Sequence, residues 1–484
     1  MEGSSTAKPW LVASAPIRML DLQACAEACA CAAGEDGLSM PEQFCTARGL
    51  RLATPEELGA IGATKAHCAA DAADAEALSA LTGAWPGWRP ETPPHSPLSW
   101  YAADPVYRRY YGQELPNWRA SVKDADHSAA LLRRIHEDEP RLTELHELGR
   151  SHQNRPVLAL RITDPKVRAL DKPTVLLNGA HHGDELLTID YAFDAIERIL
   201  ANPDWLRKLD IWVVPVVNPD GVWHTMFIDH GTRIRDGGRK NARVGTTMCG
   251  EQRQRGVDLN RNYPYKWMEA GTSDDEYSWK YGGPGPASEP EVQAMMDLAD
   301  AHRFVASITW HTFGSSILRP YTIPHTTNPD PDVAREVAEL MRPPTFTVKT
   351  AMYAVSGTDQ DWLYHEHGTL AFLLEGDDHN PVQSTDRLAS VDNVRPALDG
   401  LLDRVVDGPR IYGFVEHDSP ESVEVRIEGY QTFEGESWTA RPDGRFDRLV
   451  LGEGPFTVVA EAPDGARAEA TVSLDELPVL LVLQ

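Results

Sequence analysis

Short, continuously apolar segments alternate with stretches of helical spacing across the middle of this 484-residue chain. The clearest apolar segments are residues 174–178, 211–217 and 304–310, and residues 186–200 carry apolar side chains at helical spacing between the first two. A strand without polar alternation is buried on both faces, so helices must cover both sides of its sheet. The pattern therefore predicts an α/β domain whose sheet is covered by helices.

Changes of composition divide the chain into three expected parts. Residues 1–104 are rich in Cys, Ala and Pro and are expected to be an accessory segment or a pro-segment. Residues 107–407 hold the α/β pattern. In residues 408–484, short alternating strands separated by Pro-Asp-Gly turns predict a small β-sandwich.

The six cysteines bear on the compartment. Five of them lie within residues 1–104 and no CxxC pair occurs, so a zinc ribbon is not expected. An even-numbered and clustered set favours disulfide bonds in an oxidising compartment. We therefore expect a secreted or periplasmic protein, although no signal peptide is visible in this sequence.

The charge balance excludes some partners. The chain has 73 acidic and 46 basic side chains, a net charge of −27. Binding to phosphates requires clustered Lys and Arg, so we expect no nucleic-acid partner. No apolar stretch reaches the ~18 residues of a membrane span, so none is expected.

Two histidines and a glutamate follow the apolar strands at their carboxyl ends. His182 and Glu185 stand three residues apart after the strand at 174–178, and His311 follows the strand at 304–310. Taken singly, the first pair recurs by chance and His311 could be an ordinary core histidine. Open α/β sheets bind ligands at the carboxyl ends of their strands, and a catalytic zinc uses three N or O ligands. Together the residues predict a site for one zinc ion.

The order of several further motifs resembles that of a known family, the zinc metallocarboxypeptidases of the carboxypeptidase A and T kind. These motifs are Gly179-Ala-His-His-Gly-Asp-Glu185, Val214-Pro-Val-Val-Asn-Pro-Asp-Gly221, Arg239-Lys-Asn-Ala-Arg243, Gly256-Val-Asp-Leu-Asn-Arg-Asn-Tyr263, the Ser-Glu-Pro-Glu that ends at 291, Thr309-Trp-His-Thr-Phe-Gly314 and residues 353–364. The resemblance implies the family's mixed sheet. It also implies that the small C-terminal domain is transthyretin-like or regulatory-like.

The resemblance assigns roles to residues outside the metal site. Glu375, which ends an apolar strand, is similar to the family's general base. Asn260 and Arg261 resemble the pair that binds the C-terminal carboxylate of the substrate, and Tyr353 resembles the family's mobile phenol.

Two assignments depart from the family pattern. An arginine should stabilise the oxyanion, and we expect it to be Arg243, with Arg239 as the alternative. Gln360 stands where the family places the base of its side-chain pocket. Because Gln is neutral and polar, the preferred C-terminal residue stays open.

These features predict a zinc-dependent metallocarboxypeptidase that hydrolyses the C-terminal peptide bond of peptides bearing a free carboxylate. A metal-activated water would attack the carbonyl, with Glu375 as general base. A murein-peptide amidase or a deacylase on the same scaffold is the alternative. A binding protein without catalysis is a third possibility, which the presence of Glu375 and all three ligand candidates disfavours.

Overall fold

The computed structural model describes residues 118–120, 123–167, 172–227, 238–243, 256–376 and 384–484. In the N-terminal part it also describes three short strands, β1 (Leu11–Ala13), β2 (Arg51–Leu52) and β3 (Cys68–Ala70), with β3 between the other two. The remaining expectations for residues 1–104, including the disulfide bonds, lie outside the described residues.

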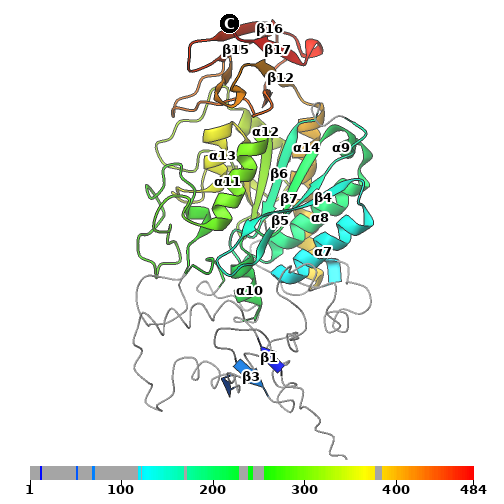
Figure 1. The fold of residues 1–484 in the computed structure, drawn as a ribbon, viewed down its shortest axis with the longest axis vertical. Helices are drawn as coiled ribbons and strands as arrows, with labels where there is room; N and C mark the ends of the chain where they lie inside the picture. The colour runs from blue at the N-terminus through cyan, green and yellow to red at the C-terminus, as the bar shows by residue number, and fades with distance from the viewer. Residues whose placement is uncertain are drawn as a thin grey trace, which may run out of the picture.

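A mixed sheet of eight strands forms the centre of the molecule, in the order β10-β9-β11-β8-β6-β7-β5-β4 (Figure 1). Strands β11, β8, β6 and β7 run parallel to one another, whereas β4, β5 and β9 pair antiparallel with their inner neighbours. The expected mixed α/β sheet is thus confirmed. The strands are β4 (Thr143–Arg150), β5 (Pro156–Ile162), β6 (Thr174–Gly179), β7 (Asp210–Val214), β8 (Ala306–His311), β9 (Ser316–Leu318), β10 (Thr347–Lys349) and β11 (Leu370–Glu375).

Helices cover both faces of this sheet, as they must, because every residue of β6, β7 and β8 is buried. Helices α8 and α14 pack on each other and on the central strands, and α13 packs on β11. The helices are α7 (Ala125–Asp138), α8 (Leu187–Ala201), α9 (Pro203–Lys208), α10 (Pro219–Phe227), α11 (Pro290–His302), α12 (Val333–Met341), α13 (Asp359–His367) and α14 (Ser384–Asp407). None of the helices in the described part of the chain has the length and apolar character needed to cross a membrane.

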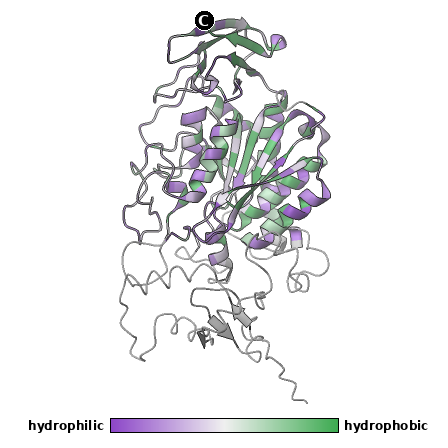
Figure 2. Cartoon of the chain, viewed as in Figure 1, coloured by the Kyte–Doolittle hydropathy of each residue, from purple (hydrophilic) through white to green (hydrophobic). Residues whose placement is uncertain are grey.

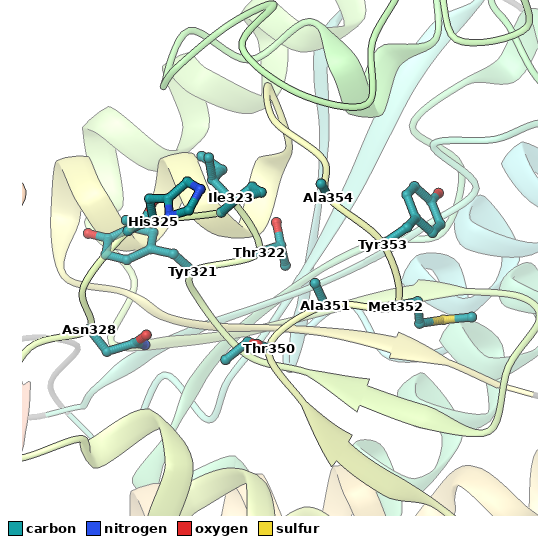
Figure 3. Close-up of a pocket in the computed structure, with 12 residues that line it drawn as sticks. Tyr321, Thr322, Ile323, His325, Asn328, Thr350, Ala351, Met352, Tyr353 and Ala354 are labelled. Carbon is teal, nitrogen blue, oxygen red and sulfur yellow. The ribbon is translucent and has the colours of Figure 1, made fainter.

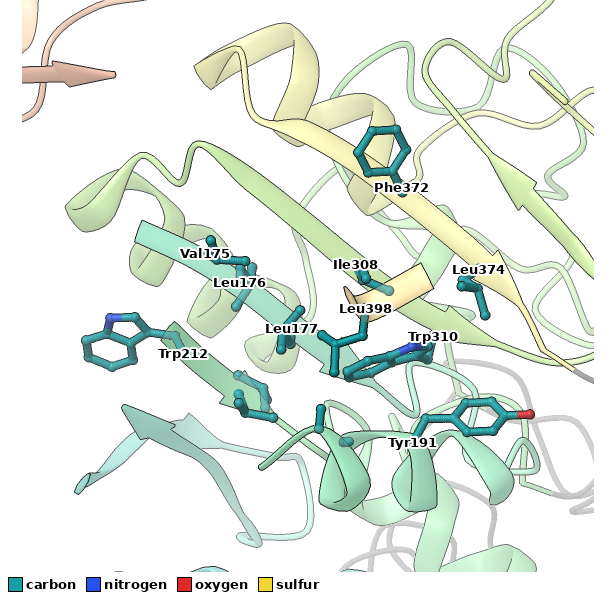
Figure 4. Close-up of a cluster of buried hydrophobic side chains, with 14 of the residues drawn as sticks. Val175, Leu176, Leu177, Tyr191, Trp212, Ile308, Trp310, Phe372, Leu374 and Leu398 are labelled. Atoms are coloured by element: carbon teal, nitrogen blue, oxygen red, sulfur yellow. The ribbon is translucent and has the colours of Figure 1, made fainter. Parts of the chain in front are cut away.

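The hydrophobic core lies between the sheet and these helices. Apolar residues gather on the central strands and on the helix faces that turn toward them (Figure 2). Tyr191 of α8 and Leu398 of α14 lie beside Leu177 and Trp310 of the sheet (Figure 4). Burial of this kind contributes about 1.5–3 kcal/mol for each large apolar side chain, so the core holds the ends of β6 and β8 in a fixed relation.

Two smaller sheets follow α14, in the orders β14-β12-β17 and β13-β15-β16, and share their own apolar core. Their strands are β12 (Arg410–Glu416), β13 (Glu424–Ile427), β14 (Arg445–Leu449), β15 (Phe456–Glu461), β16 (Arg467–Val472) and β17 (Val479–Val482). Polar contacts tie them to the large domain: Glu436 accepts a hydrogen bond from the Tyr321 hydroxyl (2.7 Å), and Trp438 Nε1 donates to the Tyr364 carbonyl (3.0 Å).

Candidate active site

His182 and Glu185 lie in the loop between the end of β6 and the start of α8. The loop turns sharply, with Ala180 at a φ of 53°, and at Gly183 it packs against the first turn of α10. A Cβ at Gly183 would lie 2.1 Å from the Gly221 carbonyl carbon, so only glycine permits this approach. The turn brings His182 Nδ1 within 2.7 Å of Glu185 Oε1, and both side chains are buried.

His311 joins this pair because β8 lies beside β6 and runs parallel to it. Its Nδ1 lies 2.9 Å from Glu185 Oε2 and 3.1 Å from His182 Nδ1. The ligand atoms of the three residues all lie within 4.8 Å of one another. The three candidates found in the sequence therefore converge on one point.

The hydrogen bonds around His182 suit a metal ion. Its Nε2 lies 3.1 Å from Asp258 Oδ1, an acceptor, so this nitrogen carries a proton and Nδ1 is the ring nitrogen that faces Glu185 and His311. Metal-ligating histidines are usually oriented by such a carboxylate. Although burial opposes it, the charges of Glu185 and Asp258 raise the pKa of His182 to about 9. This cluster therefore takes up positive charge, which a divalent cation can supply in place of a proton.

Glu375 ends β11, directly opposite His311 in the register of the parallel pair β11–β8. Its carboxylate is partly buried, and within the described residues its Oε2 has no hydrogen-bond partner. Burial and the charge of Glu185 raise its pKa to about 8. A carboxylate in this position can accept a proton near neutral pH.

Arg261 and Tyr353 meet on another side of the site. Arg261 is buried in a short 3-10 helix (Leu259–Arg261), and its Nη2 donates to the Tyr353 hydroxyl at 3.0 Å. Tyr353 is exposed over 47% of its surface, so the phenol can move without disturbing the core. Arg261 Nε has no partner among the described residues. Asn260 precedes Arg261, and its Nδ2 lies 3.3 Å from His311 Nε2.

The two arginines expected as candidates for the oxyanion, Arg243 and its alternative Arg239, lie in different surroundings. Arg243 Nη1 pairs with Glu289 Oε1 (3.0 Å), in a separate buried cluster. Arg239 Nη1 instead lies 3.7 Å from Glu185 Oε1, and its Nε donates to Asp258 at 3.0 Å. Arg239 Nη2 lies 2.9 Å from Asp258 Oδ2, so an ion pair holds the guanidinium beside the ligand cluster. The alternative, Arg239, is therefore the arginine beside the ligand cluster.

Comparison with known proteins decides the family. The sequence model described as "Zinc carboxypeptidase" (Peptidase_M14) matches residues 128–386. The chain belongs to the zinc carboxypeptidase family. Metallocarboxypeptidase A of Trichophyton tonsurans is 30% identical over 227 residues, which cover 45% of this chain and 50% of that protein. Carboxypeptidase A4 of Mus musculus is 28% identical over 259 residues, 49% of this chain and 58% of that protein. The chain thus spans about half the length of the curated relatives it matches.

A solved structure agrees in fold. The carboxypeptidase A from Helicoverpa armigera has a TM-score of 0.52 at 20% identity, over 77% of this chain and 95% of that chain. Membership of the zinc carboxypeptidase family confirms zinc as the metal for which His182, Glu185 and His311 form the candidate site.

The structure defines the expected side-chain pocket less clearly than the metal site in this member of the zinc carboxypeptidase family. Gln360 lies in the first turn of α13, and neither polar atom of its buried amide has a partner among the described residues. A cavity of about 330 Å³ lies beside Tyr353, between the loops at 321–328 and 350–354 (Figure 3). Gln360 does not line this cavity. Thr322 does line it, and its backbone N–H donates a hydrogen bond to Asp361 at 3.0 Å.

Sequence reasoning missed Asp258, which contacts both His182 and Arg239. It belongs to the same motif as Asn260 and Arg261, two positions before them. Metal-ligating histidines are usually oriented by a carboxylate, and this nearby acidic residue was the available signal.

Proposed function

We propose that this protein is a zinc metallocarboxypeptidase that removes the C-terminal residue of peptides. The observation that carries the proposal is the buried Arg261, paired with the exposed Tyr353 in the same site as Glu375 and the ligand cluster. An arginine fork is the group that recognises a planar carboxylate. The substrate of an amidase or a deacylase that lacks this carboxylate would offer Arg261 and Tyr353 no group to bind.

Each group of the site then has a chemical part in hydrolysis. Zinc held by His182, Glu185 and His311 would act as a Lewis acid toward the scissile carbonyl and lower the pKa of a water. Glu375 takes the proton of the attacking water and passes it to the leaving nitrogen, for which its raised pKa is suited. Arg239, whose Nη1 lies 3.7 Å from Glu185 Oε1, would supply the guanidinium charge that stabilises the developing oxyanion.

The substrate is held at its C-terminus. Arg261 binds the carboxylate, with Tyr353 as the second donor and Asn260 beside them. Gln360 is proposed to supply a neutral amide at the base of the pocket for the C-terminal side chain. Its unpaired donor and acceptor favour polar neutral residues over charged ones, because a buried amide without partners is costly.

The parts outside the catalytic domain are proposed to serve it. The two sheets of residues 408–484 form a β-sandwich that packs on the loop at 321 and on α13 through Glu436 and Trp438. The protein acts outside the cytoplasm, with residues 1–104 as an accessory segment or a pro-segment.

The test compares two peptides that differ only at the end, one with a free carboxylate and one amidated. The purified chain is expected to contain one zinc and to release the last residue of the free peptide alone. Glu375→Gln is expected to lower kcat by about 10³-fold or more while retaining zinc, since proton transfer contributes about 10²–10⁴-fold. Equal cleavage of both peptides would favour the amidase alternative.

A further inference from the structure

A second cluster of His and Glu residues lies outside the proposed active site. His152 Nε2 is 2.8 Å from Glu289 Oε2, and the ligand atoms of His152, Glu289 and Glu291 lie within 4.8 Å of one another. Both glutamates are fully buried, and Glu291 Oε1 has no hydrogen-bond partner in the described part of the chain. By residue type this cluster resembles a metal site as closely as the first one does.

The orientation of one amide shows that the cluster is organised for another purpose. Asn241 Oδ1 accepts hydrogen bonds from two backbone N–H groups, those of Val257 (2.9 Å) and Arg243 (3.2 Å). These bonds fix the amide so that Nδ2 donates to Glu289 Oε2 (2.8 Å) and Glu291 Oε2 (3.0 Å). Donor hydrogens therefore occupy the space between the two carboxyl groups where a cation would bind.

The cluster also has no excess negative charge for a metal cation to neutralise. Arg243 and His152 both contact Glu289. Burial alone would lower the pKa of His152, but its hydrogen bond to Glu289 raises it and favours the charged ring. Burial and the charge of Asp220 raise the pKa of Glu291 to about 8, so this carboxyl group is held protonated near neutrality.

Asn241 connects three segments that meet near the proposed active site. Its backbone N–H donates to the Val257 carbonyl at 3.0 Å, and its side chain reaches the residues that open α11. Gly256 adopts a φ of 100°, and a Cβ there would lie 1.9 Å from the Asn241 carbonyl oxygen. The segments 238–243 and 256–258 are thereby locked together, with Arg239 on one and Asp258 on the other.

We propose that Asn241 is a positioning residue for catalysis, which holds Arg239 and Asp258 in register by anchoring their two segments to Glu289 and Glu291. Arg239 lies two residues before Asn241, and Asp258 directly follows the residue that Asn241 binds. Arg239 and Asp258 contact each other, and Asp258 orients His182. A small shift of this junction therefore changes both the oxyanion donor and the support of a metal ligand. The inference rests on the proposed function in its kinetic part only.

A double-mutant cycle tests the proposal with Asn241→Ala, Arg239→Ala and the combined variant. Asn241→Ala is expected to lower kcat about tenfold with KM changed less than about threefold, because a misplaced oxyanion donor affects the transition state. If Asn241 acts through Arg239, the combined variant falls no more than about threefold below Arg239→Ala. Losses that multiply independently, or a wild-type kcat in Asn241→Ala, would overturn the proposal.

A measurement without substrate separates this inference from the proposed function. Competition with a chelator is expected to show zinc affinity reduced about threefold to tenfold in Asn241→Ala, since outer partners of metal ligands contribute about 10–100-fold when removed outright. Unchanged affinity contradicts the proposal even if the protein hydrolyses no peptide. Asn241→Asp is the second variant, for use if Asn241→Ala folds poorly. It keeps the acceptor for the Val257 N–H but places a third carboxyl group beside Glu289 and Glu291, so its zinc affinity should also be reduced. Arg243→Ala is the matched control, because it retains every side-chain bond of Asn241.

Discussion

Two buried clusters of His and Glu residues in the same domain differ in what lies between their oxygen and nitrogen atoms. In the first, His182 Nδ1 faces Glu185 and His311 because Asp258 holds the other ring nitrogen. In the second, the Asn241 amide places its hydrogens between Glu289 and Glu291. In both clusters the candidate ligand atoms lie within 4.8 Å of one another. The direction of the neighbouring donors, and not residue type or spacing, separates a cation site from a structural junction.

The largest expected effect is on metal content. Glu185→Gln should weaken zinc binding by more than about 100-fold, because even the outer partners of metal ligands are worth about 10–100-fold. Glu291→Gln, the corresponding change in the second cluster, should leave one zinc per chain. Metal analysis after dialysis against a weak chelator measures both. If the unmodified protein held two metal ions and Glu291→Gln lost one of them, the second cluster would be a metal site and the distinction drawn here would be wrong.

The two arginines give the next largest difference. Arg239→Ala should lower kcat by about 10²–10³-fold, the usual cost of removing one oxyanion donor. Arg243→Ala should change kcat less than about threefold, because its side chain contacts Glu289 in the second cluster. Steady-state kinetics on one peptide decides between them. The reverse ranking would return the oxyanion role to Arg243.

The smallest effect is on the pH dependence of stability. The pKa of Glu291 is raised in the folded protein, so folding retains its proton and this contribution to stability is lost as pH rises from about 4.5 toward 8. Glu291→Gln carries no such proton, so its stability should fall less over this interval. The difference should reach at least about 1 kcal/mol, since one pKa unit corresponds to about 1.4 kcal/mol. Urea unfolding at pH 5 and pH 8 measures it, and parallel curves would contradict the assignment.

Much of the fold followed from local pattern. The apolar runs marked β6, β7, β8 and β11, because a strand buried on both faces has few places for polar residues. The ligand candidates could be found for a related reason, since each follows one of these strands at its carboxyl end. The choice between Arg239 and Arg243 could not be made in this way. Both lie in one short irregular segment, and neither helical nor strand spacing predicts where such side chains point.

The sequence by itself determined the α/β class, the strand ends that carry His182, Glu185, His311 and Glu375, and the acidic charge that disfavours nucleic acid. Periodicity and composition are local properties, and they suffice for these conclusions. Only the tertiary structure decided which arginine faces the ligand cluster, that Asp258 orients His182, and that the second cluster is closed by Asn241. Those contacts join segments far apart in the chain, and their geometry is set by the packing of α11 and the loops at 238–243 and 256–258.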